Sequence, residues 1–397
     1  LAKAKDADRL ETFPEFPIPS LKRDSEWPTY RRDNGRTVII GAAVPEQVKH
    51  AWTWTPRAAT LPTAPIFSNG RAIIGGQDGV IRAISLDTGK LAWSAYTGGP
   101  VRYPPAAANA RLYVGAGDGY VYCLDPWSGK SYWRFRAAPA ERVIPLYGTL
   151  SSTWPVPSVL VDGDSVYAAA GISNHDGTHV YALDARTGKI KWQQQSSAYA
   201  DDDTLPNGGV SVQGPMLMHE GTVHFAAGNS PPIASYALKD GKFTPNNASR
   251  GKDLYVRNGK VLGSGYPLYW RPEDDQFLST MELECPVGVL RLGMPLNNPA
   301  GVSELRMMGK VNWSNPLFQE IAAVAIAKNA IVVTGLNRDK KDYEKITAGV
   351  AALDIQTGKV LWRESLPAVP TAWGLAIGGG QRVIVTLMDG RMVAFGN

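Results

Sequence analysis

The sequence predicts an all-β fold, a β-propeller of seven blades with eight possible, each blade a four-stranded antiparallel sheet. Two observations carry this prediction. An eleven-residue phrase recurs four times, and strand-like runs divided by turn residues recur roughly every 40–60 residues. Recurrence at such a period is typical of supersecondary units that stack on one another, because one unit cannot bury its apolar face alone.

The phrase has the same layout in every copy. It reads AISLDTGKLAW (83–93), CLDPWSGKSYW (123–133), ALDARTGKIKW (182–192) and ALDIQTGKVLW (352–362). A strand leads to a turn closed by Gly-Lys, and the next strand ends on Trp93, Trp133, Trp192 or Trp362. Glycine suits a turn position with positive φ. The indole is a large apolar group at a fixed point of each repeat, so we expect it to wedge between neighbouring blades.

The two ends of the repeat region are complementary. The predicted units cover 59–95, 101–136, 153–195, 211–246, 247–316, 319–365 and 372–396. The last unit supplies three strands, and the strand-like run 48–54 precedes the first unit without partners. Pairing them would close the ring and remove both exposed sheet edges. The stretch 247–316 is taken as one divergent blade, and eight blades result if it contains two.

Residues 1–47 carry no repeat and are predicted to form an extended N-terminal strap in front of the propeller domain, 48–397. The run 13–19 is rich in proline, which favours extended polyproline-like backbone. The run 26–32 carries aromatic residues that we expect to dock on the propeller.

Composition excludes some classes of function. The net charge is +5 with a pI near 9.0, yet no long basic run or Arg–aromatic pattern indicates nucleic-acid binding. No run of eighteen apolar residues predicts a transmembrane segment. Cys123 takes the place of an alanine in other copies, so a buried free thiol is favoured over pairing with Cys285. The chain begins at Leu1, and we expect a mature product or one domain of a larger protein.

The pattern A-x-D-x-x-T-G-K-x-x-W resembles the tryptophan-docking motif of the pyrroloquinoline-quinone-like (PQQ-like) β-propeller repeat family, over about residues 48–396. The runs 132–139 and 152–156 look like those of large exported members from planctomycete-type bacteria. The resemblance implies an extracytoplasmic protein, periplasmic or secreted. The family includes quinoprotein alcohol and sugar dehydrogenases and envelope scaffold propellers similar to the lipoprotein of the outer-membrane assembly machinery.

The dehydrogenase branch implies features that this sequence lacks. Its members carry adjacent cysteines beside the quinone, and no Cys-Cys pair occurs here. They hold calcium through Glu, Asn and Asp, and no motif assigns those positions in this chain. We therefore expect no bound PQQ, while Ca²⁺ stays possible.

Candidate ligand-binding residues gather on one predicted face. We letter the four strands of a blade A to D in chain order. The connectors from strand D to the next strand A and the turns between strands B and C emerge on the same side of a propeller. The long insertions belong to these loops, so this side is named the loop-bearing face. Arg, Tyr and Trp side chains there suit a polyhydroxylated or anionic ligand. The candidates are Arg102, Tyr103, Arg142, Trp154, Asp176, Trp313 and Trp373. The alternative is that Trp154 and Trp373 pack between blades while the arginines pair with the acidic cluster at 201–203.

Three groups could carry chemistry on this face. His175 and Tyr147 are candidate bases, since His titrates near neutrality and both lie in loops. In that case Arg102 or Arg142 would clamp a carboxylate. Asp201, Asp202 and Asp203 could hold Ca²⁺ through oxygen ligands.

Two functions follow from the sequence. The first is an exported binding or scaffold propeller that holds a glycan or protein partner on the loop-rich face, without quinone. The alternative is a carbohydrate-active enzyme, either a quinoprotein-type dehydrogenase or a polysaccharide lyase, acting at the same face. The sequence leaves open whether the protein is an enzyme.

Overall fold

The computed structural model describes residues 6–15, 27–146, 148–173, 176–196, 210–228, 231–248, 251–264, 281–293, 304–339, 341–342 and 344–396. Within these ranges the chain is built from strands, with one short 3₁₀ helix, η1 (Asp6–Arg9). No helix in the described part is long and apolar enough to cross a membrane. The all-β prediction is confirmed.

The first half of the chain forms the following strands. They are β1 (Leu10–Thr12), β2 (Lys49–Trp54), β3 (Ile66–Ser68), β4 (Arg71–Ile74), β5 (Val80–Ser85), β6 (Leu91–Tyr96), β7 (Ala106–Ala108), β8 (Arg111–Gly115), β9 (Tyr120–Leu124), β10 (Ser131–Arg136), β11 (Val143–Leu146), β12 (Thr149–Ser152), β13 (Val159–Asp162), β14 (Ser165–Ala170), β15 (Thr178–Asp184) and β16 (Ile190–Ser196).

The second half continues in the same way. Its strands are β17 (Leu217–His219), β18 (Thr222–Ala226), β19 (Ile233–Ala237), β20 (Phe243–Asn246), β21 (Asp253–Arg257), β22 (Lys260–Ser264), β23 (Met281–Cys285), β24 (Gly288–Gly293), β25 (Glu304–Gly309), β26 (Trp313–Asn315), β27 (Glu320–Ile326), β28 (Ala330–Arg338), β29 (Ile346–Asp354), β30 (Val360–Leu366), β31 (Pro370–Gly378), β32 (Arg382–Leu387) and β33 (Met392–Gly396).

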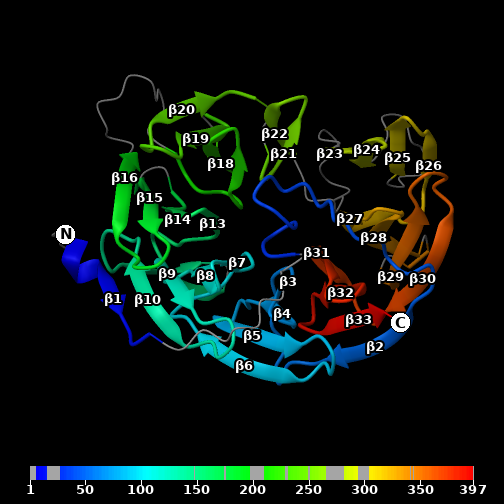
Figure 1. The fold of residues 1–397 in the computed structure, drawn as a ribbon, viewed down its shortest axis with the longest axis horizontal. Coiled ribbons are helices and arrows are strands. Elements are labelled where there is room, and N and C mark those ends of the chain that lie inside the picture. Colours follow the sequence, from blue (N-terminus) through cyan, green and yellow to red (C-terminus); the bar gives the residue numbers. More distant parts are fainter. Residues whose placement is uncertain are drawn as a thin grey trace.

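The sheets stand side by side in a ring (Figure 1). The four-stranded antiparallel sheets of the described residues are β3–β6, β13–β16, β17–β20, β23–β26, β27–β30 and β31–β33 with β2, and β7–β10 gains β1 as a fifth strand. The first strand of a sheet contacts the first strand of a neighbouring sheet, as in β3 with β7, β21 with β23 and β27 with β31. These first strands therefore line the axis of the ring.

Ring closure follows the prediction. Strand β2 pairs antiparallel with β33, with Trp54 opposite Met392 and Lys49 opposite Gly396. The last sheet thus takes its outer strand from the N-terminal part of the chain. Closure pairs the first and last parts of the ring, which a chain of stacked sheets would otherwise expose to other chains.

The stretch 247–316 differs from the single divergent blade that the sequence predicts. The described residues of this stretch form two separate sheets, the two-stranded β21–β22 and the four-stranded β23–β26. Strand-like runs expected at 253–257, 260–262 and 287–292 do fall in β21, β22 and β24. The strands were thus predictable, whereas the sequence left open whether they belong to one unit or two, because no repeat phrase marks where one unit ends.

The recurring phrase forms the same turn wherever it is complete. The Asp184 carboxylate accepts hydrogen bonds from the backbone N–H (2.8 Å) and hydroxyl (2.7 Å) of Thr187, and Asp354 accepts the same pair from Thr357. Gly188 follows with φ +73°. A side-chain acceptor for the turn amide explains the Asp and Thr of the phrase, and the positive φ explains its glycine.

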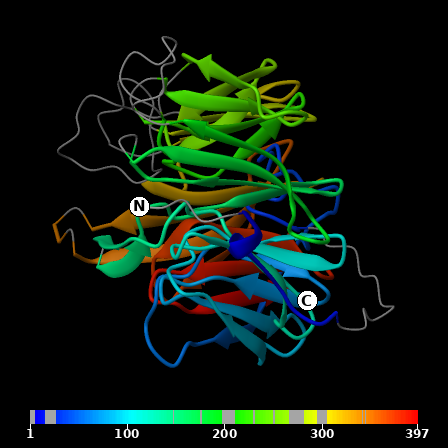
Figure 2. The same cartoon turned by 90° about the vertical axis from the view of Figure 1, so that its left-hand side faces the viewer.

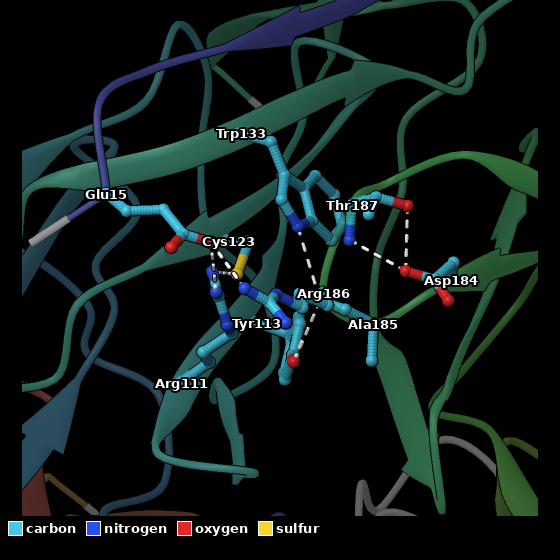
Figure 3. Close-up of polar contacts among 9 residues, drawn as sticks. All are labelled: Glu15, Arg111, Tyr113, Cys123, Trp133, Asp184, Ala185, Arg186 and Thr187. Carbon is cyan, nitrogen blue, oxygen red and sulfur yellow. Dashed lines mark hydrogen bonds and ion pairs between the residues drawn. The ribbon is translucent and has the colours of Figure 1, made fainter. Parts of the chain in front are cut away.

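Each tryptophan of the phrase packs against the next sheet of the ring. The indole of Trp133 donates a 3.3 Å hydrogen bond to the carbonyl of Ala185 (Figure 3). The Trp133 ring also covers Gly188. A methyl group on Gly188 would lie 2.8 Å from Cδ2 of Trp133, so only glycine fits under the ring. A register shift of one residue precedes this tryptophan in the β9–β10 pair. Such a bulge turns the side chain out of the regular alternation.

The same contact recurs around the ring. The indole N–H donates to the turn carbonyl of the following sheet in these pairs: Trp93 to Pro126, Trp192 to Leu238, Trp313 to Ile355, Trp362 to Pro45 and Trp52 to Leu86. The inter-blade packing expected for Trp93, Trp133, Trp192 and Trp362 is therefore present. Sheet β21–β22 takes part in none of these contacts.

Candidate functional site

Residues 27–44, here named the axial segment, lie inside the ring. Its backbone bonds to the first strands on several sides: the carbonyls of Trp27 and Pro28 accept from Phe67 (β3) and Ala107 (β7), both at 2.8 Å. The N–H of Ile40 donates to Ile326 (β27) at 2.8 Å. In Figure 1 this segment, in blue, runs between the sheets near the middle of the ring. The docking expected for 26–32 is thus an insertion along the axis.

Two arginines of the axial segment are fully buried. Arg36 donates to the carbonyls of Met216 (2.9 Å) and Tyr30 (2.6 Å). Arg31 donates to the carbonyl of Leu254 on β21 (2.9 Å) and contacts Sδ of Met281 on β23 (3.5 Å). Burial lowers the pKa of Arg31, and it lowers the pKa of Arg36 to about 10. Both guanidinium groups therefore need the surrounding carbonyl groups as hydrogen-bond acceptors in place of water.

One acidic side chain and several aromatic side chains surround Arg31. The guanidinium carbon lies 4.1 Å from the centre of the Trp373 ring. The Asp253 carboxylate is held by Trp373 and by the Tyr30 hydroxyl, and Tyr30 stacks edge-on against Tyr103 with centroids 5.4 Å apart. Burial raises the pKa of Asp253, Tyr30 and Tyr103. This arrangement is a buried ionic cluster that fixes the axial segment.

A second cluster lies on the loop-bearing face. Arg142 forms an ion pair with Asp176, donates to the Thr153 hydroxyl at 2.8 Å, and lies over the ring of Trp154. The Trp154 indole donates to the carbonyl of Asp176 at 2.8 Å. Arg142, Trp154 and Asp176, proposed from sequence as ligand-binding residues, are thus brought together. They bond to one another in this cluster.

This second cluster lies at the base of the hairpin β11–β12, where Arg142 directly precedes β11 and Thr153 directly follows β12. Pro145 lies opposite Leu150 in this pair, and Val143 is two residues from Pro145 on the same strand, so the three share one face. That face is open to solvent: Val143 is 64% exposed and Leu150 is 69% exposed. Figure 2 shows this hairpin and the end of the β28–β29 hairpin, in orange, projecting to the same side of the molecule.

The structure separates other predicted ligand residues. Tyr103 and Trp373 belong to the axial cluster, where Trp373 is only 3% exposed, so its ring is not offered to a ligand. Arg102 is half-buried beside Tyr103. Trp313 lies on the outer strand β26 and covers Gly358 of the next sheet, as the phrase tryptophans do. Its indole is used for packing because β26 is the fourth strand of its sheet.

Some residues predicted to act as bases or calcium ligands fall outside the described residues. This applies to Tyr147, His175 and the trio Asp201, Asp202 and Asp203. Within the described ranges, no three His, Cys, Asp or Glu side chains come together as metal ligands. Cys123 and Cys285 are both free thiols, Cys123 buried on β9 and Cys285 at the end of β23.

Sequence reasoning missed the importance of Arg31, Arg36 and Asp253. The available signal was the run WPTYRRDNGR at 27–36, in which arginines follow closely spaced aromatic residues in a stretch without repeats. Asp253 carried no signal, because it is an ordinary strand residue by pattern. Its role depends on a segment more than 200 residues away in sequence.

Comparisons with known proteins agree with the fold. Residues 77–254 match the family model described as "Outer membrane protein assembly factor BamB". A polyvinylalcohol dehydrogenase from a Pseudomonas species is 26% identical over 69% of this chain and 35% of its own length. A serine/threonine-protein kinase AfsK from Streptomyces griseus is 32% identical over 43% of this chain and 19% of its own length. The chain thus spans about a third or less of these relatives.

Solved structures share the architecture at low identity. A quinohemoprotein alcohol dehydrogenase from Pseudomonas putida aligns with a TM-score of 0.63 at 13% identity, covering 94% of this chain and 80% of that one. A europium-containing methanol dehydrogenase aligns with a TM-score of 0.55 at 10% identity, covering 94% and 98%. At these identities the likeness concerns the fold alone. The repeat phrase, the ring of antiparallel sheets and these matches confirm the resemblance to the PQQ-like β-propeller repeat family.

Proposed function

We propose that this chain is an exported, non-catalytic propeller that serves as a scaffold for a protein partner and binds no quinone. The observation that carries the proposal is the axial segment, which occupies the middle of the ring with the chain's own residues. The matched family model, whose printed name is that of an assembly factor, supports a binding role. An extracytoplasmic location is part of the proposal and agrees with that name.

The described residues do not fit a PQQ site. A planar quinone held by indole stacking needs an open indole face, and the ring of Trp373 near the axis is covered by the Arg31 guanidinium. The perimeter indoles of Trp93, Trp133 and Trp313 cover glycines of neighbouring sheets. Cys123 and Cys285 stand on different sheets, so they cannot form a ring disulfide of adjacent residues.

The loop-bearing face supports a protein partner rather than a glycan. The open face of β11–β12 presents Val143, Pro145 and Leu150, which are apolar and have no polar group to pair with sugar hydroxyls. Arg142, which could otherwise bind a carboxylate, is already paired with Asp176. An exposed apolar hairpin, with the bonded Arg142 cluster at its base, suits a partner that buries apolar side chains against it.

A dehydrogenase is the second candidate, favoured by the match to the polyvinylalcohol dehydrogenase over 69% of this chain. Reconstitution separates the two candidates. The purified full chain is incubated with PQQ and Ca²⁺, desalted, and examined by absorbance and by dye-linked oxidation of alcohols. We expect no retained quinone and no turnover. Retention of about one quinone per chain, with a shifted spectrum, would overturn the scaffold proposal.

The partner surface is tested by site-specific photo-crosslinking in the producing cells. A photoreactive residue at position 150 is expected to give one discrete crosslinked product. The same group at Tyr96, which is 75% exposed on the outer strand β6, serves as the matched control and should give none. Val143→Ser with Pro145→Ser should abolish the product at 150. Equal crosslinking from both positions would contradict a specific surface.

A further inference from the structure

The axial segment touches the propeller as a bound peptide touches its receptor. Its contacts are made to strands that come from all parts of the chain. Asn34 donates to Val161 on β13 at 2.7 Å and accepts from Met218 on β17 at 2.8 Å. Ile39 pairs in parallel with Ile326 on β27. Main-chain bonds to exposed strand groups, with side chains in specific places, are the usual way in which proteins bind extended peptides.

The conformation of the axial segment is imposed by its surroundings. Arg31, Arg32, Arg36 and Val38 all have positive φ, at 52°, 80°, 60° and 56°. Such values disfavour residues with a side chain, and most of all a β-branched residue such as Val38. Strain of this kind persists only where the neighbouring structure compensates it. The bonds from β13, β17, β21 and β27 supply that compensation.

The two buried arginines are the side chains of the axial segment that the ring contacts most specifically. Arg31 and Arg36 are buried and bonded to the carbonyls of Leu254 and Met216. Arg32, between them in sequence, keeps 38% of its side chain exposed and pairs with its neighbour Asp33. Buried guanidinium groups on oriented carbonyls and on an indole face discriminate strongly against shorter side chains.

We propose that the axis of this propeller is a peptide-recognition site, selective for a segment with the spacing Tyr-Arg-x₄-Arg, and that residues 27–44 occupy it in cis. The site does not depend on any partner of the loop-bearing face. The segment leaves the axis near Val44, which is held by two hydrogen bonds to the Asn329 amide. It then reaches β2, so ring closure and axial binding are linked through a few exposed residues, Glu46 and Gln47.

The test uses the folded full chain, cut after purification. One protease site is inserted between Glu46 and Gln47, and a second within 16–26, so that β1 is cut away from the axial segment. We expect the excised segment to stay with the ring during gel filtration. A fluorescent synthetic peptide of residues 27–46 should then replace it, as followed by anisotropy.

Variant peptides decide the role of the arginines. Arg31→Ala and Arg36→Ala peptides should bind at least about tenfold more weakly than the parent. The Arg32→Ala peptide is the matched control and should bind within about twofold. Equal binding of all three would overturn the proposal. Release of the segment without rebinding, or loss of the β-sheet circular dichroism on cutting, would also overturn it, because the segment would then be an inseparable part of the fold.

Discussion

The ring is held together in two different ways in its two arcs. In the regular arc, from β26 around through β2 and β3 to β20, the outer strands carry tryptophans that donate to the turn of the next sheet. On either side of β21–β22 the described residues show no such contact. There Arg31 joins β21 to β23 from the axis, through the Leu254 carbonyl and the Met281 sulfur. The regular arc is therefore joined at the perimeter by tryptophan contacts. The divergent arc, which is β21–β22 with its junctions to the sheets on either side, is joined near the axis by Arg31.

This difference shows what the repeat phrase contributes. Where Trp and Gly are present, each junction buries an indole over a glycine and satisfies the indole N–H. Beside β21–β22, where the described residues show no such junction, Arg31 contacts both β21 and β23. The axial segment supplies this link, so its removal should affect β21–β26 first, whereas damage to a tryptophan junction should affect the two sheets that it joins.

The largest effect is expected from Arg31→Ala. It removes the buried hydrogen bond to the Leu254 carbonyl and the contact with the Met281 sulfur, which together link β21 to β23, so the free energy of unfolding should fall by about 3–4 kcal/mol. Arg32→Ala should cost less than about 1 kcal/mol. Urea unfolding measures both, and hydrogen exchange should rise mainly in β21–β26. A rise spread evenly over the ring would remove the distinction between the arcs.

Gly188→Ala tests a perimeter junction. The added methyl would meet Trp133 at 2.8 Å and Leu10 at 2.7 Å, at a residue with φ +73°, so a loss of about 2–3 kcal/mol is expected. Gly163→Ala is the matched control, since φ is also positive (54°) and nothing lies near the added methyl. It should cost only about 1 kcal/mol. Equal losses for both variants, in thermal unfolding, would mean that the indole contact contributes nothing.

Stability should also respond to pH through His224 on β18, in the sheet next to β21–β22. Burial lowers its pKa from 6.5 to about 4, so the unfolded chain binds a proton that the folded chain refuses. Stability is then full above pH 6.5 and falls as the pH drops toward 4. Between pH 7 and pH 5 the loss is about 2 kcal/mol. His224→Gln should flatten this dependence in urea titrations at the two pH values, and His50→Gln, an exposed control, should leave it unchanged.

Trp313→Phe should have the smallest effect. It keeps most of the ring over Gly358 and loses the 3.0 Å hydrogen bond to the Ile355 carbonyl, at a cost of about 1 kcal/mol. A residue that only bound a ligand would show no change in stability. The midpoint of chemical unfolding, compared with that of Trp192→Phe as a second perimeter junction, therefore distinguishes a packing role from the ligand-binding role predicted from sequence.

Much of the fold was predictable because its rules are local. The turn that Asp184, Thr187 and Gly188 form depends on neighbours in sequence, so the phrase predicts it wherever it recurs. The closing pair β2–β33 followed from counting strands. The candidate site was less accessible. The sequence placed Arg142, Trp154 and Asp176 on one face, but their mutual pairing, and the positions of Tyr103 and Trp373 in the axial cluster, depended on contacts that no local pattern encodes.

By itself, then, the sequence determined the type of sheet, the turns, the glycine and tryptophan junctions of the regular arc and the closure of the ring. Each of these depends on residue type and on spacing along the chain. Only the tertiary structure decided that residues 27–44 lie along the axis and that Arg31 bonds to strands from 223 to 250 residues away in sequence. The physical reason is that a buried charge takes whatever partners the closed ring presents, and those partners exist only after every sheet is in place.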